Sequence, residues 1–534
     1  MTDTLTIKGP FDITSNGNTT LIQQKRNSHL ANVRDYGAKG DGVSNDTLSF
    51  LSAIAVLKSE GGGVLYIPAG KYKLYKSTNG YAVGQYETTT NYALGIDFSN
   101  ILIQGDGIGL TILLAATVST TILYIITPDL NNITIKDITF EQPDAASDYA
   151  NTKTAFVLKG LDPLKATNFI DQGWTLASMV YISGTPNHYI NNVYINGCDF
   201  KNPVRHGLCF GWVKNVRITD NYIHYYDGFK SPESSGNAVG AGRCGIFSGD
   251  APIHDVLVSG NNFNGNVTNL APIGSSQTGY AYVAADGFIW FSKGGNINIE
   301  NNTIRNYGLE AIQIEAAPAS IKNNKYVTSV GTPSAVACLA FPHSPLITDI
   351  DTPVYEFSGN TVIGDGMGCG FRMVGPTWAY DGNLPTPRGR AIVNGNVFEN
   401  VDTAVNVFSA DSLVCSNNIA TNIIKFFFYM FEPYDITFPK LDFRNKFSSF
   451  TGNVINGCSD IPFIFNSTMM NNGAIIIKGN IATRGNYHLV LAYPRDKETY
   501  SVSLKDNLWI NPDGTVGNTP LIAYTPLPSS IKFF

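Results

Sequence analysis

The 534-residue sequence predicts an all-β protein, a right-handed parallel β-helix of about a dozen coils with an N-terminal capping helix and a short C-terminal tail. Three observations lead to this fold class: the composition, a short phrase that recurs along most of the chain, and a second strand that aligns in the same coils. Charged residues are only 15% of the chain, against roughly 25% in an average soluble domain, which argues against a disordered chain, a coiled coil or a helical bundle. Aromatic residues at 12% and 52 glycines favour strands and turns instead.

The recurring phrase is an apolar residue, two residues of any type, an asparagine, one further residue and a second apolar residue. Alternating apolar and polar residues on both sides make each copy a strand, a bend and a second strand, and asparagine suits the bend because it tolerates left-handed backbone conformation. A sandwich of hairpins would not keep asparagine at one phase of the repeat, so we expect coils stacked at ~4.8 Å with their asparagines hydrogen-bonded along the axis. The copies are centred on Asn221, Asn261, Asn302, Asn324, Asn360, Asn396, Asn417, Asn453, Asn480 and Asn507, with degenerate copies at Asp106, Ile138 and Cys198.

A second strand follows the asparagine by about eight residues in coils without an insertion. Its third and fifth residues are mostly apolar and are expected to point inward, the second is glycine or alanine, and the fourth points outward. Reading down the stack, the aligned strands begin at His206, Cys244, Asp286, Glu310, Ser334, Cys369 and Thr403.

The two ends of the chain differ from the repeat. Residues 1–31 are expected to form an N-terminal arm, and residues 32–75 a cap of strand, helix and strand that covers the first coil of the solenoid. The helix is expected to start after Asp46 or Asn45 as N-cap, with an apolar face of Leu48, Leu51, Ile54 and Leu57. The β-helix with its loop insertions then covers residues 76–510, and residues 511–534 are a proline-rich, apolar tail that we expect to contact another chain.

Charge and cysteine content exclude several kinds of partner. The net charge is −6 and no run of lysine or arginine occurs, so we expect neither a nucleic-acid partner nor a membrane partner. The sequence contains no stretch of ~18 consecutive apolar residues, so we expect no membrane span. The seven cysteines are odd in number and widely spaced, so neither a disulfide framework nor a metal site is expected, and no cofactor either. The same cysteine pattern indicates folding in a reducing compartment, and the first residues show no pattern of a secretory signal.

The opening of the predicted cap resembles that of a known superfamily. Residues 33–42 read Val-Arg-Asp-Tyr-Gly-Ala-Lys-Gly-Asp-Gly, and Asp46-Thr47, a triple glycine at 61–63 and Pro-Ala-Gly-Lys-Tyr at 68–72 follow. These motifs cover about forty residues and are similar to the opening of pectate-lyase-like β-helix proteins, most of all to bacteriophage tailspike depolymerases. The coil phrase extends the resemblance over most of the chain.

The resemblance implies a homotrimer that cleaves a bacterial surface polysaccharide. It also implies a place in the virion tail, reached after folding in the host cytoplasm. Because the opening phrase occurs in bacterial enzymes too, an extracellular bacterial enzyme is the alternative.

Asp286 and Glu310 are the predicted catalytic residues because they fall in the same slot of adjacent coils, 24 positions apart. Two carboxylates on neighbouring strands would lie about 5 Å apart, within the range in which paired acids hydrolyse glycosides. Repulsion between them should keep one protonated as the acid and leave the other ionised. The pair resembles the acids of polygalacturonase-type hydrolases, although Ala284-Ala285 replaces their Asn-Thr and no Gly-His-Gly follows. The stereochemical outcome stays open.

Loops swell on both sides of this strand, at 227–243, 266–284, 341–354 and 375–389, and should form a groove around the two acids. Aromatic rings in the groove can stack on sugar faces, and basic side chains can bind an acidic sugar. Gln313 and Glu315 lie at outward positions of the Glu310 strand. The predicted substrate-binding residues are Glu315, Gln313, Arg243, Lys293, Arg305, Arg372, Trp290, Tyr282, Trp378 and Tyr380.

Other interpretations of the same residues stay open. An aspartate before glycine is often a turn residue, and Asp286 shares strand parity with Phe288 unless Gly287 breaks the alternation, so Glu315 is the substitute catalytic acid. Two other functions compete with hydrolysis. One is a polysaccharide lyase acting on a uronate through Lys293 with Arg305 or Arg372, and the other is a glycan-binding adhesin without activity.

Overall fold

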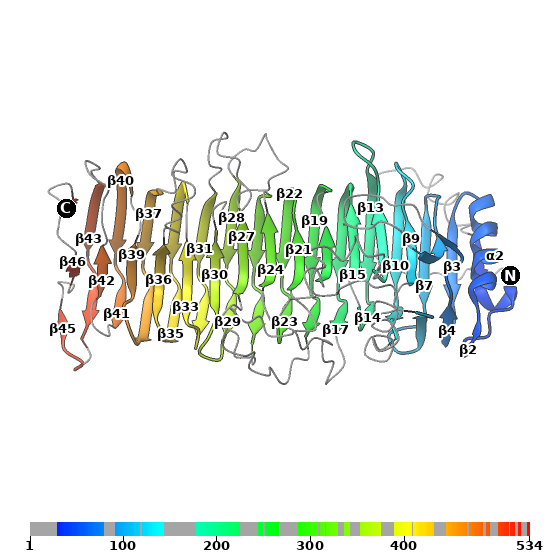
Figure 1. Ribbon diagram of the computed structural model, residues 1–534, viewed down its shortest axis with the longest axis horizontal. Coiled ribbons are helices and arrows are strands. Elements are labelled where there is room, and N and C mark those ends of the chain that lie inside the picture. Colours follow the sequence, from blue (N-terminus) through cyan, green and yellow to red (C-terminus); the bar gives the residue numbers. More distant parts are fainter. Residues whose placement is uncertain are drawn as a thin grey trace, which may run out of the picture.

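The chain folds as a right-handed parallel β-helix of three long sheets, which confirms the predicted fold class. In the computed structural model the coils are stacked in chain order from helix α2 (Thr47–Ser59) at one end to the C-terminal strands at the other (Figure 1). Sheets A and B contain sixteen strands each and sheet C fifteen, which is more than the dozen coils predicted. The structure describes residues 29–79, 91–117, 120–143, 178–203, 206–224, 244–248, 251–265, 287–307, 310–315, 317–328, 336–341, 353–374, 389–407, 410–431, 445–466, 469–483, 488–491, 500–511, 513–517, 522–524 and 531–533.

Sheet A comes first in each coil, and its strands alternate between buried and half-buried residues, as in Ile101–Gly105. Its strands in order are β1 (Leu30–Asn32), β3 (Gly63–Ile67), β7 (Ile101–Gly105), β10 (Asn131–Lys136), β13 (Ile190–Asn196), β16 (Val213–Thr219), β19 (Ile253–Ser259), β22 (Gly294–Glu300), β25 (Ala319–Lys322), β28 (Val354–Ser358), β31 (Arg390–Asn394), β34 (Ser412–Ser416), β37 (Asn445–Thr451), β40 (Met469–Lys478), β43 (Tyr500–Lys505) and β47 (Ile531–Phe533).

Sheet B follows sheet A after a sharp bend, and most of its strands are only three residues long. Its strands in order are β2 (Asp41–Asn45), β4 (Gly70–Leu74), β8 (Thr111–Ala115), β11 (Thr139–Glu141), β14 (Asp199–Lys201), β17 (Tyr222–His224), β20 (Asn262–Asn264), β23 (Thr303–Arg305), β26 (Lys325–Val327), β29 (Thr361–Ile363), β32 (Val397–Glu399), β35 (Ile419–Ile423), β38 (Val454–Cys458), β41 (Ile481–Thr483), β44 (Leu508–Ile510) and the antiparallel β45 (Val516–Gly517).

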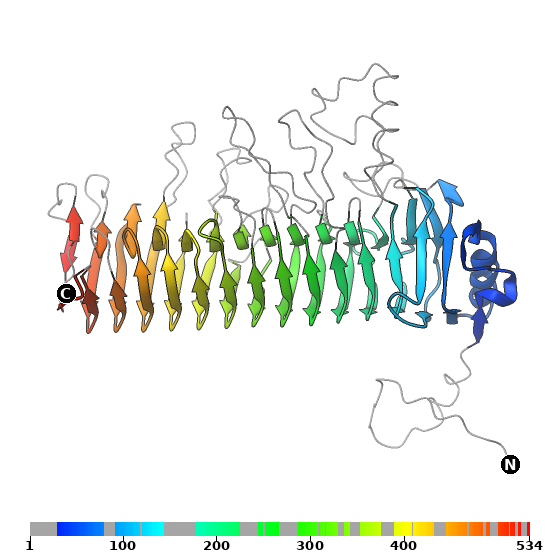
Figure 2. The same cartoon turned by 90° about the horizontal axis from the view of Figure 1, so that it is seen from below.

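Sheet C closes each coil, and Figure 2 shows the coils stacked along one straight axis. Its strands in order are the antiparallel β5 (Thr78–Asn79), then β6 (Asn91–Gly95), β9 (Thr120–Ile125), β12 (Val180–Ser183), β15 (His206–Gly211), β18 (Cys244–Ser248), β21 (Gly287–Phe291), β24 (Glu310–Glu315), β27 (Val336–Phe341), β30 (Cys369–Met373), β33 (Thr403–Val407), β36 (Phe426–Phe431), β39 (Phe463–Asn466), β42 (Leu489–Leu491) and β46 (Ile522–Tyr524).

The asparagine ladder predicted from the repeat forms at the bend between sheets A and B. From Asn221 to Asn480 the side-chain amide nitrogen and the backbone N–H of each ladder asparagine donate to the Oδ1 of the next, at 2.8–3.1 Å, and Asn507 is the last acceptor. The ladder asparagines are at most 5% exposed. They satisfy one another in a bend that would otherwise bury unpaired amides.

The left-handed backbone conformation belongs to the residue before each ladder asparagine, and not to the asparagine as predicted. These preceding residues are all glycine, asparagine or aspartate, with φ between 55° and 70°. In one coil the predicted phase was wrong: Asn418 and not Asn417 is the ladder residue, because Asn417 takes the left-handed position at φ 55°. Cys415 and Ala420 then point into the core.

The N-terminal cap agrees with the prediction in its order of elements and differs in its contacts. A 3-10 turn, η1 (Val33–Tyr36), precedes α2, and the buried face of α2 includes Phe50, Ala53 and Leu57. Leu48 was expected on this face but is 75% exposed. The side chain of the predicted N-cap Asp46 does not bond to the helix. It accepts hydrogen bonds from the backbone N–H groups of Lys39 and Gly40, at 2.7 and 3.1 Å, and so anchors the preceding loop.

The remaining predictions about the chain have mixed outcomes. β46 and β47, within the predicted tail 511–534, continue sheets C and A by parallel pairing, so the solenoid extends further than expected. Within the described residues, six cysteines are free and buried. Among the described segments, no helix is both long and apolar enough to cross a membrane.

Candidate functional site

One face of sheet C carries side chains that point away from the core and change type from coil to coil. Tyr124, Tyr181, Cys209 and Phe247 form a cluster separate from the main core, with Trp290 packed against it, while their strand neighbours pack inside. We call the row of residues in register with them the outer file. Its members in order are Tyr124, Tyr181, Cys209, Phe247, Trp290, Gln313, Leu339, Arg372, Asn406 and Tyr429.

The structure brings three of the predicted substrate-binding residues together in the middle of the outer file. Trp290 Nε1 donates to Glu315 Oε1 at 3.0 Å, and Gln313 Nε2 donates to the same oxygen at 2.6 Å. The Trp290 ring meets Phe247 edge to face, with ring centroids 5.4 Å apart. All three side chains of the Glu315 cluster are half-buried, so the carboxylate is held in a fixed position at the surface.

Glu310 lies on the same side of the sheet as this cluster. It is the half-buried first residue of β24 and is in register with Val336. Val336 packs against Leu339 and Cys369 in a cluster outside the main core, which places the Glu310 position on the outward side as well.

The predicted register between Asp286 and Glu310 was wrong by one residue. Glu310 pairs with Gly287, and Ile289 pairs with Ile312. The prediction paired Gly287 with Ala311 because both are small. In the structure the alternation of inward and outward residues is interrupted here, so that the consecutive residues Phe288 and Ile289 both point into the core. The strand predicted to start at Ser334 is also out of register, by two residues, because Val336 pairs with Glu310. Asp286 itself lies outside the described residues, so its catalytic role stays a prediction.

Glu310 and Glu315 do not form a catalytic pair with each other. Five residues of one strand separate their Cα atoms by about 16 Å. Two acids acting on one glycosidic bond lie roughly 5–10 Å apart. A second acid acting with Glu310 must therefore come from another part of the chain.

The four predicted cations lie in different places. Arg372 is on the outer file, two strands beyond Gln313, and in the described part of the chain its Nε has no hydrogen-bond partner. An unpaired buried donor is the kind of group that a bound ligand or water completes. Lys293 is half-buried in the turn that follows β21. Arg305 is exposed on sheet B, where it donates to Asn262, so the structure does not join it to the Glu315 cluster. Arg243 is outside the described residues.

The predicted aromatic residues Tyr282, Trp378 and Tyr380 also lie outside the described residues, as do most positions of the four loops. In the described ranges no group of three or more histidine, cysteine, aspartate or glutamate side chains is placed to hold a metal ion. Beside Arg372, burial raises the pKa of the Cys369 thiol to about 11. This thiol is therefore not a nucleophile near neutral pH.

The sequence analysis did not single out the aromatic part of the outer file. Tyr92 and Tyr124 are stacked with ring centroids 4.6 Å apart, and Tyr124 and Tyr181 at 5.4 Å. These strands precede the first clear asparagine, where the coil phrase is degenerate, so the alignment of second strands did not reach them. The available signal was an aromatic residue at the fourth, outward position of the second strand, as at Tyr181 and Phe247.

A family model described as rhamnogalacturonase A/epimerase, pectate lyase-like, matches residues 30–325. Two curated relatives from Azotobacter vinelandii are similar over 82 residues, mannuronan C5-epimerase AlgE3 at 40% identity and alginate lyase 7 at 38%. The matched segment is 15% of this chain and only 4% and 8% of these relatives. Among solved structures, ORF18 of Geobacillus virus E2 superposes with a TM-score of 0.32 at 11% identity, over 92% of this chain and 62% of the viral chain.

Proposed function

The chain belongs to the rhamnogalacturonase A/epimerase family of pectate lyase-like proteins, and we propose that it is a depolymerase that hydrolyses glycosidic bonds of a bacterial surface polysaccharide. The proposed site is the outward side of sheet C at β21 and β24. The observation that carries the proposal is the Glu315 carboxylate held by Trp290 and Gln313 on the same outward side of sheet C as Glu310. An ordered acid next to a half-buried indole ring provides both polar contacts and a stacking surface for a sugar.

The residues of this site have separate roles in the proposal. Glu310 acts on the glycosidic bond, and its partner acid is Asp286, which precedes the Gly287 that pairs with Glu310. Trp290 and Gln313 both donate to Glu315 and orient its carboxylate, which accepts hydrogen bonds from sugar hydroxyls. The Trp290 ring supports the apolar face of a bound sugar.

Incubation with a panel of capsular polysaccharides and exopolysaccharides, polymannuronate included, tests the proposal. Hydrolysis creates one reducing end per cleaved bond, and mass spectra show saturated fragments. Glu310→Gln and Asp286→Asn should each abolish the new reducing ends. A protein that binds a polymer and leaves its length unchanged with every substrate would be an adhesin, contrary to the proposal.

A second candidate function is supported by Arg372. A cation on the outer file, two strands from Gln313, can neutralise a uronate carboxylate, which is the first requirement for abstracting the neighbouring proton. The family name includes epimerases, and the relatives AlgE3 and alginate lyase 7 are named for a mannuronan epimerase and an alginate lyase. Product analysis separates the three reactions. A lyase product carries an unsaturated sugar that absorbs ultraviolet light, and an epimerase leaves the chain length unchanged.

We also propose that the protein is a homotrimer, as the tailspike resemblance implies, and that it is part of a virion tail. A row of aliphatic side chains on sheet B supports self-association: Val397, Ile419, Val454, Ile481 and Leu508 are in register over five coils. Ile419, Val454 and Ile481 are 49%, 37% and 38% exposed. The same row is polar at Thr303, Lys325 and Thr361 in earlier coils.

Light scattering tests the assembly. Ile419→Lys should lower the mass from that of a trimer to that of a monomer, because the charge would be buried in an apolar contact. Thr303→Lys, at the same position of an earlier coil, is the matched control and should leave the mass unchanged. A wild-type chain that is monomeric at high concentration would contradict the assembly and leave an extracellular monomeric enzyme as the alternative.

A further inference from the structure

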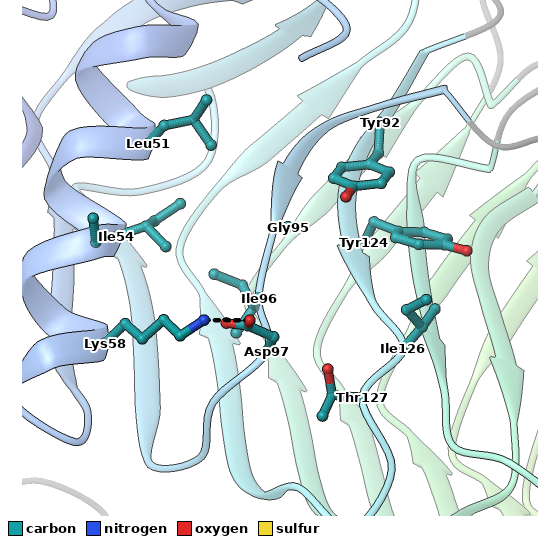
Figure 3. A pocket seen from close by; sticks show the side chains of 11 residues that line it. Leu51, Ile54, Lys58, Tyr92, Gly95, Ile96, Asp97, Tyr124, Ile126 and Thr127 are labelled. Carbon is teal, nitrogen blue, oxygen red and sulfur yellow. Dashed lines mark hydrogen bonds and ion pairs between the residues drawn. The ribbon is translucent and has the colours of Figure 1, made fainter. Parts of the chain in front are cut away.

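A pocket of 380 Å³ lies between helix α2 and the first strands of sheet C. Figure 3 shows the Tyr92 and Tyr124 rings on one side, Leu51 and Ile54 of α2 on the other, and the Lys58–Asp97 ion pair between them. Its size falls within the roughly 300–1,000 Å³ of small-molecule sites. The pocket is remote from Glu310, and the proposed hydrolysis does not use it.

The local sequence keeps one wall of the pocket open and aromatic. Gly95 is in register with Tyr124, so it occupies the position of the outer file in β6. The Tyr92 ring lies over Gly95, where a Cβ would be 2.9 Å from the ring, and is stacked on Tyr124. Because Gly95 has no side chain, the half-buried Tyr92 ring lies flat at the start of the outer file.

The other walls supply polar groups at the edge of this ring. Lys58 and Asp97 form an ion pair whose side chains are 54% and 52% exposed, so both retain hydrogen-bonding capacity toward a ligand. Thr127 adds a hydroxyl group, and Leu51 and Ile54 add an apolar surface. An aromatic face with charged donors and acceptors at its edge is the chemistry that binds a sugar ring, which has apolar faces and equatorial hydroxyls.

The position of the pocket connects it with the proposed catalytic site. β6 and β24, the strand that carries Glu310, are separated by six strand spacings of sheet C, which is about 29 Å. A polysaccharide lying along the solenoid axis reaches both places with several sugar residues between them.

We propose that this pocket is a second carbohydrate-binding site, which takes one sugar residue of the same polymer that is cleaved at Glu310. The inference rests on the proposed function for the identity of the polymer. It adds a requirement for the length of the polysaccharide, because only a polymer that spans about 29 Å occupies both sites at once.

The ratio of KM values for short and long fragments of the cleaved polysaccharide tests this inference. Tyr92→Leu removes the aromatic face and should raise KM for long fragments about tenfold relative to short ones, as loss of one binding anchor does. Asp97→Asn, an exposed and nearly isosteric change, should move the same ratio in the same direction if Tyr92→Leu fails to fold. Tyr75→Leu is the matched control, because Tyr75 is an exposed tyrosine near the cap and outside the pocket.

Binding of the intact polymer to Glu310→Gln, with and without Tyr92→Leu, separates this inference from the proposed function. Cleavage by the wild type together with an unchanged KM ratio and unchanged binding would overturn the second site alone. Absence of cleavage together with binding that Tyr92→Leu weakens would overturn the hydrolase and support the pocket. A free monosaccharide that competes for the pocket as well as the polymer does would contradict a site for chain residues.

Discussion

The bend between sheets A and B and the outward side of sheet C are built from the same coils, yet they use the sequence in opposite ways. At the bend, one residue type recurs from Asn221 to Asn507, and each copy makes the same hydrogen bonds. On the outer file the residue changes from Phe247 to Trp290 to Gln313 in successive coils. Repetition in this solenoid therefore marks structure, and departure from repetition marks the surface where a ligand can be recognised.

The energetic consequences of the two regions should differ accordingly. A ladder asparagine is buried and bonded to two coils, so its loss leaves donors and acceptors without partners in the interior. Trp290, Gln313 and Glu315 on the outward side are half-buried, and no ladder hydrogen bond depends on them. Mutations at the bend should lower stability, and mutations on sheet C should lower activity.

Replacement of the proposed catalytic acid should have the largest effect. Glu310→Gln should reduce kcat by at least a hundredfold, because general acid–base catalysis contributes about 10²–10⁴ in rate. Thermal unfolding should stay close to that of the wild type, since the position is half-buried. Glu399→Gln on sheet B is the matched control, because Glu399 is an exposed glutamate on another sheet. Equal loss of activity in Glu310→Gln and Glu399→Gln would contradict the proposal that the outward side of sheet C carries the catalytic site.

Removal of one ladder asparagine should have the next largest effect, on stability. Asn360→Ala loses the bonds to Asn396 Oδ1 at 3.1 Å and to the Ile321 carbonyl at 2.9 Å, and leaves Asn324 without its acceptor. We expect a cost of about 2–4 kcal/mol, visible as a lower midpoint in thermal unfolding. Asn298→Ala should cost less than about 0.5 kcal/mol, because the side-chain hydrogen bond that Asn298 donates within the described residues is a 3.3 Å contact with Asn296 at the surface. A cost that is the same for both would mean that the ladder adds no stability.

Removal of a single N–H on the outer file should have a smaller effect on activity. Trp290→Phe keeps an aromatic ring and deletes the hydrogen bond to Glu315. We expect kcat/KM to fall about tenfold, the equivalent of one charge-assisted hydrogen bond. Trp509→Phe is the control, because Trp509 is buried in the last coils and its Nε1 has no partner in the described structure. Unchanged kcat/KM in Trp290→Phe would show that Glu315 needs no fixed position.

The smallest effect should be in the alkaline stability of the bend. Cys198 occupies the ladder position one coil before Asn221, and burial raises the pKa of its thiol to about 12. Its contribution to stability is therefore complete below the pKa of about 9 of the unfolded thiol, and is lost as the pH rises from about 9 to 12. Cys198→Ala should make the fall of unfolding free energy in this range shallower by up to about 1.4 kcal/mol per pH unit. An identical slope in the two proteins would contradict burial of the thiol.

The fold was predictable because its determinants repeat. The coil phrase identified the strands and the ladder from the printed sequence, and the one phase error arose where Asn417 and Asn418 are adjacent. Two asparagines fit the pattern there, and only the backbone conformation distinguishes the left-handed residue from the ladder residue. The cap helix was predicted, but Leu48 was not seen to be exposed, because helical spacing alone does not say which face meets the first coil.

The candidate site was only partly predictable because its determinants do not repeat. Gln313 and Glu315 were identified by strand parity. Trp290 was named for its aromatic ring, although the fifth position of its predicted strand was expected to point inward, and the structure places it on the outward side beside Glu315. The register of Asp286 failed because an insertion precedes it, and a shift of one residue at a strand bend leaves the apolar pattern almost unchanged. The pocket beside Tyr92 depends on a helix and a strand that no repeat connects.

A crystal structure of Glu310→Gln with a bound fragment of the cleaved polysaccharide tests the central claim most directly. The account predicts sugar residues on the outward side of sheet C, with one ring against Trp290, hydroxyls on Glu315 and the scissile bond at position 310. Sugar bound along sheet A or sheet B, with the Trp290 and Glu315 side chains unoccupied, would contradict it.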